Sequence, residues 1–81
     1  MKKLSSTGAL LKTYISRVSV ARMGTLTSLS GRTWERRQLA PGDLTLSELK
    51  QLQAACGLSN DEVCALVLSY LWGDKKTATI G

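Results

Sequence analysis

Apolar residues recur every three or four positions in five stretches of the chain, separated by polar stretches that contain Ser, Thr, Gly or Pro. This spacing places the apolar side chains on one face of a helix. The alternation typical of a half-buried strand is not sustained anywhere, and the sequence has no Asn-Gly hairpin turn. The pattern therefore predicts an all-α fold, a compact five-helix orthogonal bundle.

The first two expected helices lie in the N-terminal part of the chain. The first carries an apolar stripe, and hydroxyl residues before it can cap its N-terminus. The stripe is Leu10, Leu11, Tyr14, Ile15 and Val18, and the cap candidates are Ser5, Ser6 and Thr7. The second helix is short and ends near residues 27–28; it has Ser19 as its cap and Val20, Met23 and Leu26 as apolar residues.

The third expected helix begins after the cap Ser30, carries Trp34 on its inward face and ends near Leu39. Pro41 ends this helix because a proline disfavours helical geometry at the residue before it. Gly42 then lets the chain turn.

Each of the last two expected helices begins with a capping box, in which a hydroxyl residue is followed three positions later by glutamate. The boxes are Thr45 with Glu48 and Ser59 with Glu62, and Gly57 separates the two helices. The residues expected to face inward are Leu46, Leu49, Leu52 and Cys56 in the fourth helix, and Val63, Leu66, Val67, Tyr70 and Leu71 in the fifth.

The chain has 81 residues, for which we expect a single domain over residues 1–73 and a polar, flexible tail over residues 74–81. No window approaches the roughly 18 consecutive apolar residues of a membrane span. Two lysines begin the chain as in a signal peptide, but Lys12 and Arg17 interrupt the apolar run that follows, and no small-residue cleavage site comes after it. We therefore expect a cytoplasmic protein with no membrane segment.

The sequence offers little for catalysis or metal binding. Cys56 and Cys64 are the two cysteines and there is no histidine, so one chain cannot complete a four-ligand zinc site. We expect both thiols to be reduced core residues, since a disulfide would need an oxidising compartment. The hydroxyl residues have no partner base, and there is no glycine-rich phosphate loop. We expect no metal, no cofactor and no enzymatic activity.

Positive charge is concentrated in the first half of the chain. Residues 1–41 hold eight basic residues and one acid, a net charge of +7, whereas residues 42–81 hold three basic residues and five acids, a net charge of −2. This asymmetry predicts an anionic partner that meets the first half of the chain.

Two windows fit a helix-turn-helix, which reads DNA with the exposed N-terminal face of its second helix. In the window 49–68 that helix would present Asn60, Asp61 and Glu62, and the carboxylates would repel phosphates. We interpret this window as structural support. In the window 20–39 the second helix presents arginines, which pair with guanine and with phosphate, so it is the better candidate.

The segment LSGRTWERRQLAPGDLTLSELKQLQAACGLS resembles the Cro/repressor-type (lambda-repressor-like) helix-turn-helix family of phages and mobile elements. In that family a turn and a serine begin the reading helix, then come threonine, an aromatic residue, basic residues, Pro-Gly and a Leu-Thr-Leu-x-Glu-Leu helix. The resemblance covers about residues 20–65. It implies a DNA-binding fold and a transcriptional regulator that binds double-stranded DNA sequence-specifically, with residues 30–39 in the major groove.

The chain departs from the family pattern at three places. Ser28 stands where the turn usually has glycine, and Gly24 where the second helix usually has alanine; both are small, so we expect a close helix crossing. Val20 and Ala21 replace a polar residue, often glutamine, that anchors a phosphate. Arg22 or Ser19 can take over that contact.

The candidate site residues fall into two groups. The candidates for base reading are Ser30, Arg32, Thr33, Glu35 and Arg36, and the candidates for phosphate contact are Lys12, Arg17, Ser19, Arg22 and Arg37. Structural alternatives stand beside them: Ser30 can act as a cap alone, Thr33 can simply pack, Glu35 can pair with Arg32, and the basic residues can lie on a solvated face.

A single small domain buries little DNA surface, so specificity favours a homodimer that reads two half-sites about 34 Å apart. Tyr70, Leu71 and Trp72 are candidates for the dimer contact, or else they close the core. The alternative function is that of a helical adaptor that uses the same scaffold to bind a protein, because a fold does not determine a function.

Overall fold

The structure is a computed structural model and describes residues 4–73. Within this range it contains five α-helices, one turn of 3-10 helix and one turn of π-helix, and no strand. The elements are α1 (Ser6–Ile15), α2 (Val20–Leu26), α3 (Gly31–Leu39), η1 (Pro41–Asp43), α4 (Leu46–Cys56), α5 (Asn60–Leu68) and η2 (Ser69–Gly73). The predicted all-α bundle of five helices is confirmed for this part of the chain. The predicted tail, 74–81, lies outside the described residues.

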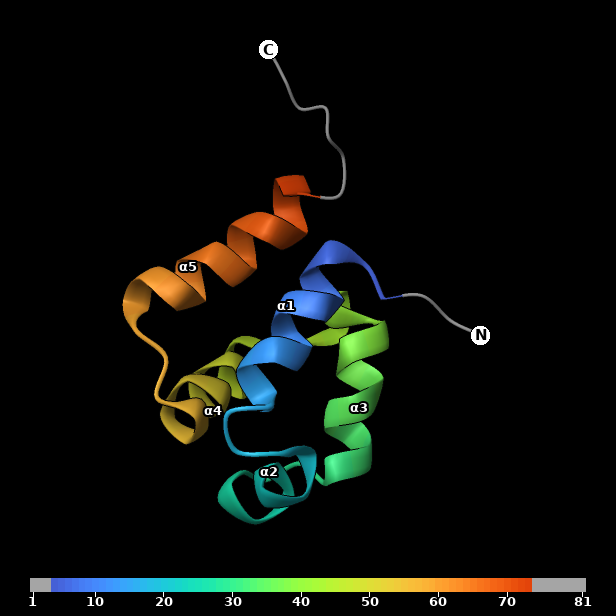
Figure 1. The fold of residues 1–81 in the computed structure, drawn as a ribbon, viewed down its shortest axis with the longest axis vertical. Coiled ribbons are helices and arrows are strands. Elements are labelled where there is room, and N and C mark those ends of the chain that lie inside the picture. The colour runs from blue at the N-terminus through green and yellow to red at the C-terminus, as the bar shows by residue number, and fades with distance from the viewer. Residues whose placement is uncertain (1–3, 74–81) are drawn as a thin grey trace.

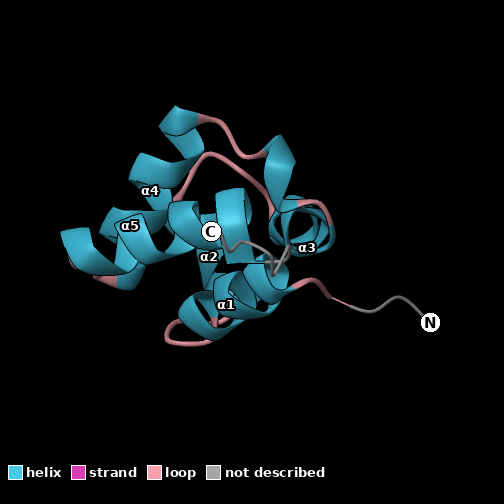
Figure 2. Ribbon diagram, turned by 90° about the horizontal axis from the view of Figure 1, so that it is seen from above, coloured by secondary structure: helices cyan, strands magenta, loops and turns pink. Residues whose placement is uncertain are grey.

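Helix α1 occupies the centre of the bundle (Figure 1) and contacts α3, α4, α5 and both short helical turns. Helix α2 packs mainly on α3, and the view from above shows the helices crossing one another rather than running parallel (Figure 2). The core contains side chains from all five helices: Leu11, Tyr14, Ile15, Met23, Trp34, Leu52, Cys56, Leu58 and Leu66.

Every α-helix begins at a hydroxyl residue whose side chain accepts a backbone N–H from its first turn. These caps are Ser5, Ser19, Ser30, Thr45 and Ser59. Both predicted capping boxes are confirmed, since Glu48 and Glu62 accept the N–H of their own cap residues. The helix starts are therefore determined by local hydrogen bonds that the sequence encodes directly.

Three apolar residues that the sequence placed inward are exposed, and this part of the prediction is wrong. Leu46 is 85% exposed, and Leu26 and Cys64 also face solvent. Leu46 and Cys64 each come two residues before a buried residue, Glu48 or Leu66. Side chains two positions apart point to opposite sides of a helix, so one of each pair must face solvent.

The fifth helix also differs from its expected form, because α5 ends at Leu68 and a π-helical turn follows. Leu66 is its one buried residue. Val67, Tyr70 and Leu71, which were expected to pack inward, are exposed along with Trp72. The end of α5 projects from the bundle (Figure 1) and packs chiefly on α1, so too few neighbours surround it to cover both of its apolar sides.

Two close backbone contacts hold α3 against its neighbours. A Cβ atom on Gly8 of α1 would lie 2.2 Å from the carbonyl oxygen of Gln38, and one on Gly24 of α2 would lie 3.2 Å from the N atom of Gly31. The close α2–α3 crossing expected from small residues is confirmed. The contact of α1 with α3 is closer still, and it leaves no room for a side chain at Gly8.

We predict that Gly8→Ala lowers the free energy of unfolding by about 1–3 kcal/mol, because the added methyl group must push α1 away from α3. Gly24→Ala is the control and should destabilise the protein less. Its contact needs a shift of only a few tenths of an ångström, and alanine favours a helix by roughly 1 kcal/mol over glycine. Urea denaturation of both variants checks this, and a Gly8→Ala protein as stable as the parent would contradict the close contact.

Candidate nucleic-acid interface

Helix α3 is fixed at its centre by Trp34, whose side chain is fully buried. The indole Nε1 donates a hydrogen bond to Oγ1 of Thr27 at 2.8 Å, and the same oxygen accepts the backbone N–H of Leu29 at 3.2 Å. One hydroxyl group thus connects the core of α3 to the turn between α2 and α3. The predicted core position of Trp34 is confirmed.

Helix α4 forms a hydrogen bond to the turn between α2 and α3. Oε1 of Gln51 accepts the backbone N–H of Ser28 at 2.7 Å. Ser28 has a negative φ, so the turn forms without the glycine that is usual in the family that the segment resembles. Sequence reasoning missed both Thr27 and Gln51, because neither position carries a periodic or motif signal and their partners are distant or on another helix.

The N-terminus of α3 is capped as the sequence predicts. Oγ of Ser30 accepts the backbone N–H of Thr33 at 3.2 Å, and the two hydroxyl groups lie 3.1 Å apart. Ser30 is exposed and Thr33 is half-buried. The structural role of this pair is therefore confirmed, while a contact of either residue with DNA stays a prediction.

Arg32 and Arg36 lie one turn apart on α3 and are both exposed. This i, i+4 spacing puts them on one side of the helix, well away from the buried Trp34. Neither guanidinium forms an ion pair within residues 4–73. These two residues therefore present positive charge that no carboxylate of the described chain neutralises.

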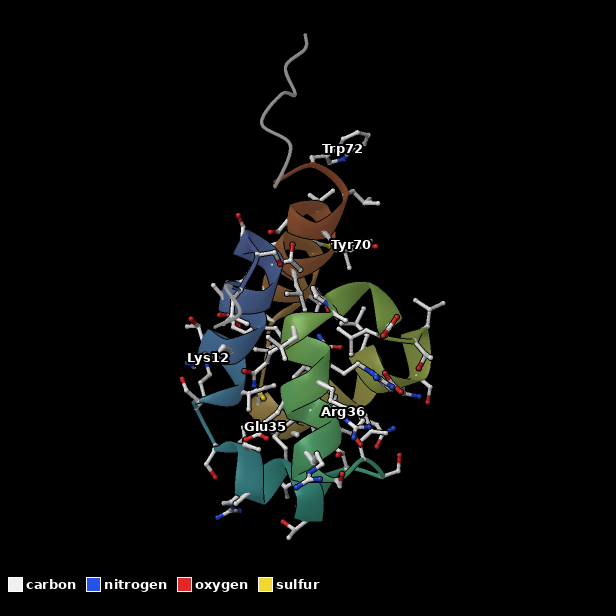
Figure 3. All side chains as sticks on the ribbon, turned by 90° about the vertical axis from the view of Figure 1, so that its right-hand side faces the viewer. Lys12, Glu35, Arg36, Tyr70 and Trp72 are labelled. Atoms are coloured by element: carbon white, nitrogen blue, oxygen red, sulfur yellow. The ribbon has the colours of Figure 1, made fainter. Side chains whose placement is uncertain are left out.

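Glu35 lies on a different side of α3 from its arginine neighbour. Figure 3 shows Glu35 on the side of the helix near α1, and Arg36 on the other side. The expected ion pair of Glu35 with Arg32 is absent from the described part of the chain. That alternative for Glu35 is wrong, since residues three apart on a helix meet only when both side chains turn toward each other.

Two arginines named as phosphate candidates have carboxylate partners within the protein. Arg37 Nε donates to Glu48 Oε1 at 3.0 Å, and this pair is largely buried between α3 and α4. Arg17 donates from both Nη atoms to Glu62 of α5 and lies 5.2 Å from the Tyr14 ring centroid. Their contact with phosphate stays a prediction, but their charges are already used to hold helices together.

The remaining phosphate candidates are Lys12, Ser19 and Arg22, and all three are exposed. Ser19 caps α2 by accepting the backbone N–H of Arg22 at 3.2 Å. It has a φ of 97°, which is costly for a residue with a side chain. Lys12 and Arg22 form no ion pair among the described residues.

These ion pairs shift the pKa values of both carboxyl groups. Hydrogen bonds from Arg17, then from the backbone of Ser59, lower the pKa of Glu62 from 4.5 to about 2. The hydrogen bond from Arg37 also lowers the pKa of Glu48, with help from the backbone of Thr45. Both glutamates are therefore charged throughout the neutral range.

Comparison with models of protein families, with curated proteins and with solved structures finds no match to this chain. Among residues 4–73 no helix is long and apolar enough to cross a bilayer. In the same range no group of three or more His, Cys, Asp and Glu side chains is placed to hold a metal ion.

We predict that the protein loses stability as the pH falls from 4.5 towards 2. The folded-state pKa of Glu62 lies below its unfolded value, so the unfolded state binds more protons in this range. The stabilisation is fully present above pH 4.5 and is lost as Glu62 is protonated. Urea midpoints measured across this range should fall less steeply for Glu62→Gln than for the parent. Equal slopes would show that the Arg17–Glu62 pair does not stabilise the fold.

Proposed function

We propose that the protein binds double-stranded DNA and regulates transcription, with α3 in the major groove. The observation that carries this proposal is the pair Arg32 and Arg36, which are exposed, one turn apart and free of ion pairs among residues 4–73, on a helix fixed to the core by Trp34. Arginines on the exposed side of a rigid helix can pair with guanine edges and with phosphate oxygens. The proposed protein is a cytoplasmic regulator of a phage or mobile element and needs no cofactor.

The helix N-terminus supports the same proposal. Helix α3 begins at Gly31, and the N-terminus of a helix carries partial positive charge that attracts phosphate. Lys12 of α1 and Arg22 of α2 add positive charge that no carboxylate of the described range 4–73 pairs with. The DNA backbone would therefore be held from more than one helix while α3 reads base edges.

We predict that Arg32→Ala and Arg36→Ala relax sequence preference, each by about 1–3 kcal/mol at the bases they contact. Arg22→Ala should instead weaken binding to all duplexes alike and reduce the salt slope by about 1. Lys50→Ala, on the exposed side of α4, is a charge-matched control that should leave the preference unchanged.

Selection of bound duplexes from a random pool, followed by titrations at several salt concentrations, measures these effects. Absence of duplex binding at low salt would reject the DNA proposal. A uniform loss of affinity in all three arginine variants would leave a nonspecific binder.

We further propose that the protein acts as a homodimer through Tyr70, Leu71 and Trp72. These side chains are 54%, 50% and 63% exposed, so they do not close the core of the described chain. Exposed apolar residues that cluster at the end of one helix are typical of an interaction surface. A dimer would double the DNA contact and give access to two half-sites.

We predict that Trp72→Glu raises the dimer dissociation constant by about tenfold or more, because a carboxylate would be buried in an apolar contact. Leu26→Glu, which changes an exposed apolar residue of α2, is the matched control. Sedimentation equilibrium without DNA provides the measurement. A monomeric parent protein, or an unchanged dissociation constant in Trp72→Glu, would rule out this interface.

The second candidate function is that of an adaptor that binds another protein. Leu46 of α4 and Val67 of α5 are exposed beside Tyr70, which extends the apolar surface beyond the end of α5. This apolar surface can bind another protein. A parent protein that is monomeric and does not bind duplex DNA at low salt would favour the adaptor function. The two functions therefore give opposite outcomes in the same pair of assays.

A further inference from the structure

A groove of about 600 Å³ lies between α1 and α3, on the side of α3 that carries Glu35. Its floor includes Ile15, which is buried, and Val20, which is half-buried, and Leu39 lies at its rim. The volume is within the range of small-molecule sites, roughly 300–1,000 Å³. The groove therefore has room for a ligand and an apolar surface against which it can pack.

Gln38 of α3 is a buried polar residue that lines this groove. The residue is only 8% exposed, yet its side-chain amide forms no hydrogen bond with the described residues. Within residues 4–73 no buried side-chain nitrogen or oxygen atom lacks a hydrogen-bond partner, so the unpaired atoms of this amide must still be reached by water. Because Gln38 lines the groove, a ligand there can replace water as the hydrogen-bond partner of this amide.

Two opposite charges stand on the walls of the same groove. Lys12 belongs to α1 and Glu35 to α3, and Figure 3 shows both on the same side of the molecule. They are more than 4.0 Å apart, since no ion pair joins them, and neither pairs with another residue in the range 4–73. A purely anionic ligand would meet Glu35 and a purely cationic one would meet Lys12, so each would be repelled by one wall.

We propose that this groove binds a small zwitterion with an apolar body, namely an aliphatic amino acid or a short aliphatic peptide. The ligand carboxylate lies by Lys12 and its ammonium by Glu35, so each charge finds the opposite sign. The Gln38 amide hydrogen-bonds to the polar end of the ligand. The aliphatic side chain covers Ile15 and Val20, which removes apolar surface from water.

The proposed site joins α1 to α3, the helix that also carries Arg32 and Arg36. The binding site itself does not depend on the proposed function, because it can be assayed without DNA. Whether the ligand changes the affinity for DNA would be measured in a separate, second experiment.

The test uses isothermal titration and two-dimensional amide NMR on the full chain without DNA. The probes are leucine, leucyl-leucine, 4-methylpentanoate, which has only the carboxylate, and 3-methylbutylamine, which has only the amine. We expect a zwitterion to bind at least about tenfold more tightly than either single-charge probe. The Gln38 side-chain amide signals should shift on binding. The comparison of leucine with leucyl-leucine shows which length the groove accepts.

Three variants and one control assign the contacts. Lys12→Gln and Glu35→Gln should each weaken binding of the preferred zwitterion by about tenfold, and Gln38→Leu, which removes the side-chain amide, should also weaken it. Arg36→Gln, adjacent to Glu35 but on the other side of α3, should bind as the parent does.

Circular dichroism on each variant separates loss of binding from loss of folding. Failure of every probe to bind at millimolar concentration would overturn the proposal. So would equal binding of the zwitterions and the single-charge probes, or equal losses in Arg36→Gln and Glu35→Gln.

Discussion

The arrangement of α2 and α3 depends on the hydrogen bond from Trp34 to Thr27. A fully buried indole needs a partner for its N–H, and Thr27 supplies it from the turn that joins the two helices. The same hydroxyl donates to the carbonyl oxygen of Met23 at 2.7 Å, so it also closes the end of α2. Because α3 is held at its centre in this way, the direction in which Arg32 and Arg36 project is fixed by the core.

Electrostatics divides the basic residues of the chain into two groups. Glu48 and Glu62 each complete a capping box and also accept hydrogen bonds from an arginine elsewhere in the fold, Arg37 of α3 or Arg17 in the turn after α1. Arg37 and Arg17 are therefore engaged in the fold. Paired charges contribute to rigidity, while the arginines on α2 and α3 that have no ion pair within residues 4–73 remain available to a polyanion.

Two surfaces of the described chain lack partners, and their chemistry differs. The first surface consists of exposed apolar residues at the end of α5, in the η2 turn and at Leu46. These residues carry no charge, which suits a protein contact. The groove between α1 and α3 has an apolar floor, two opposite charges and one solvent-accessible amide, which suits a small polar molecule. The arginines of α3 lie outside both surfaces, but Lys12 belongs to the proposed DNA contact and to the groove, so a duplex and a small ligand share this residue.

Much of the fold was predictable because its signals are local. Caps and capping boxes act within four residues, and apolar stripes need only helical periodicity, so the five helices and Trp34 as a core residue followed from the pattern. The sequence also placed Ser30 at the start of the third helix and Arg32 and Arg36 on its exposed side. These predictions required no knowledge of how the helices pack.

Features that depend on residues far apart in the chain could be seen only in the tertiary structure. An apolar stripe does not say whether a neighbour will cover it, so Leu46, Cys64 and the end of α5 were placed inward but are exposed. The sequence does not show which carboxylate an arginine pairs with, so the ion pairs of Arg17 and Arg37 were found only in the structure. By itself the sequence determined the helices and the sign of their charge, because both are local properties. Which charges stay free, and which polar group is left in a groove, were decided by packing between residues far apart in the chain.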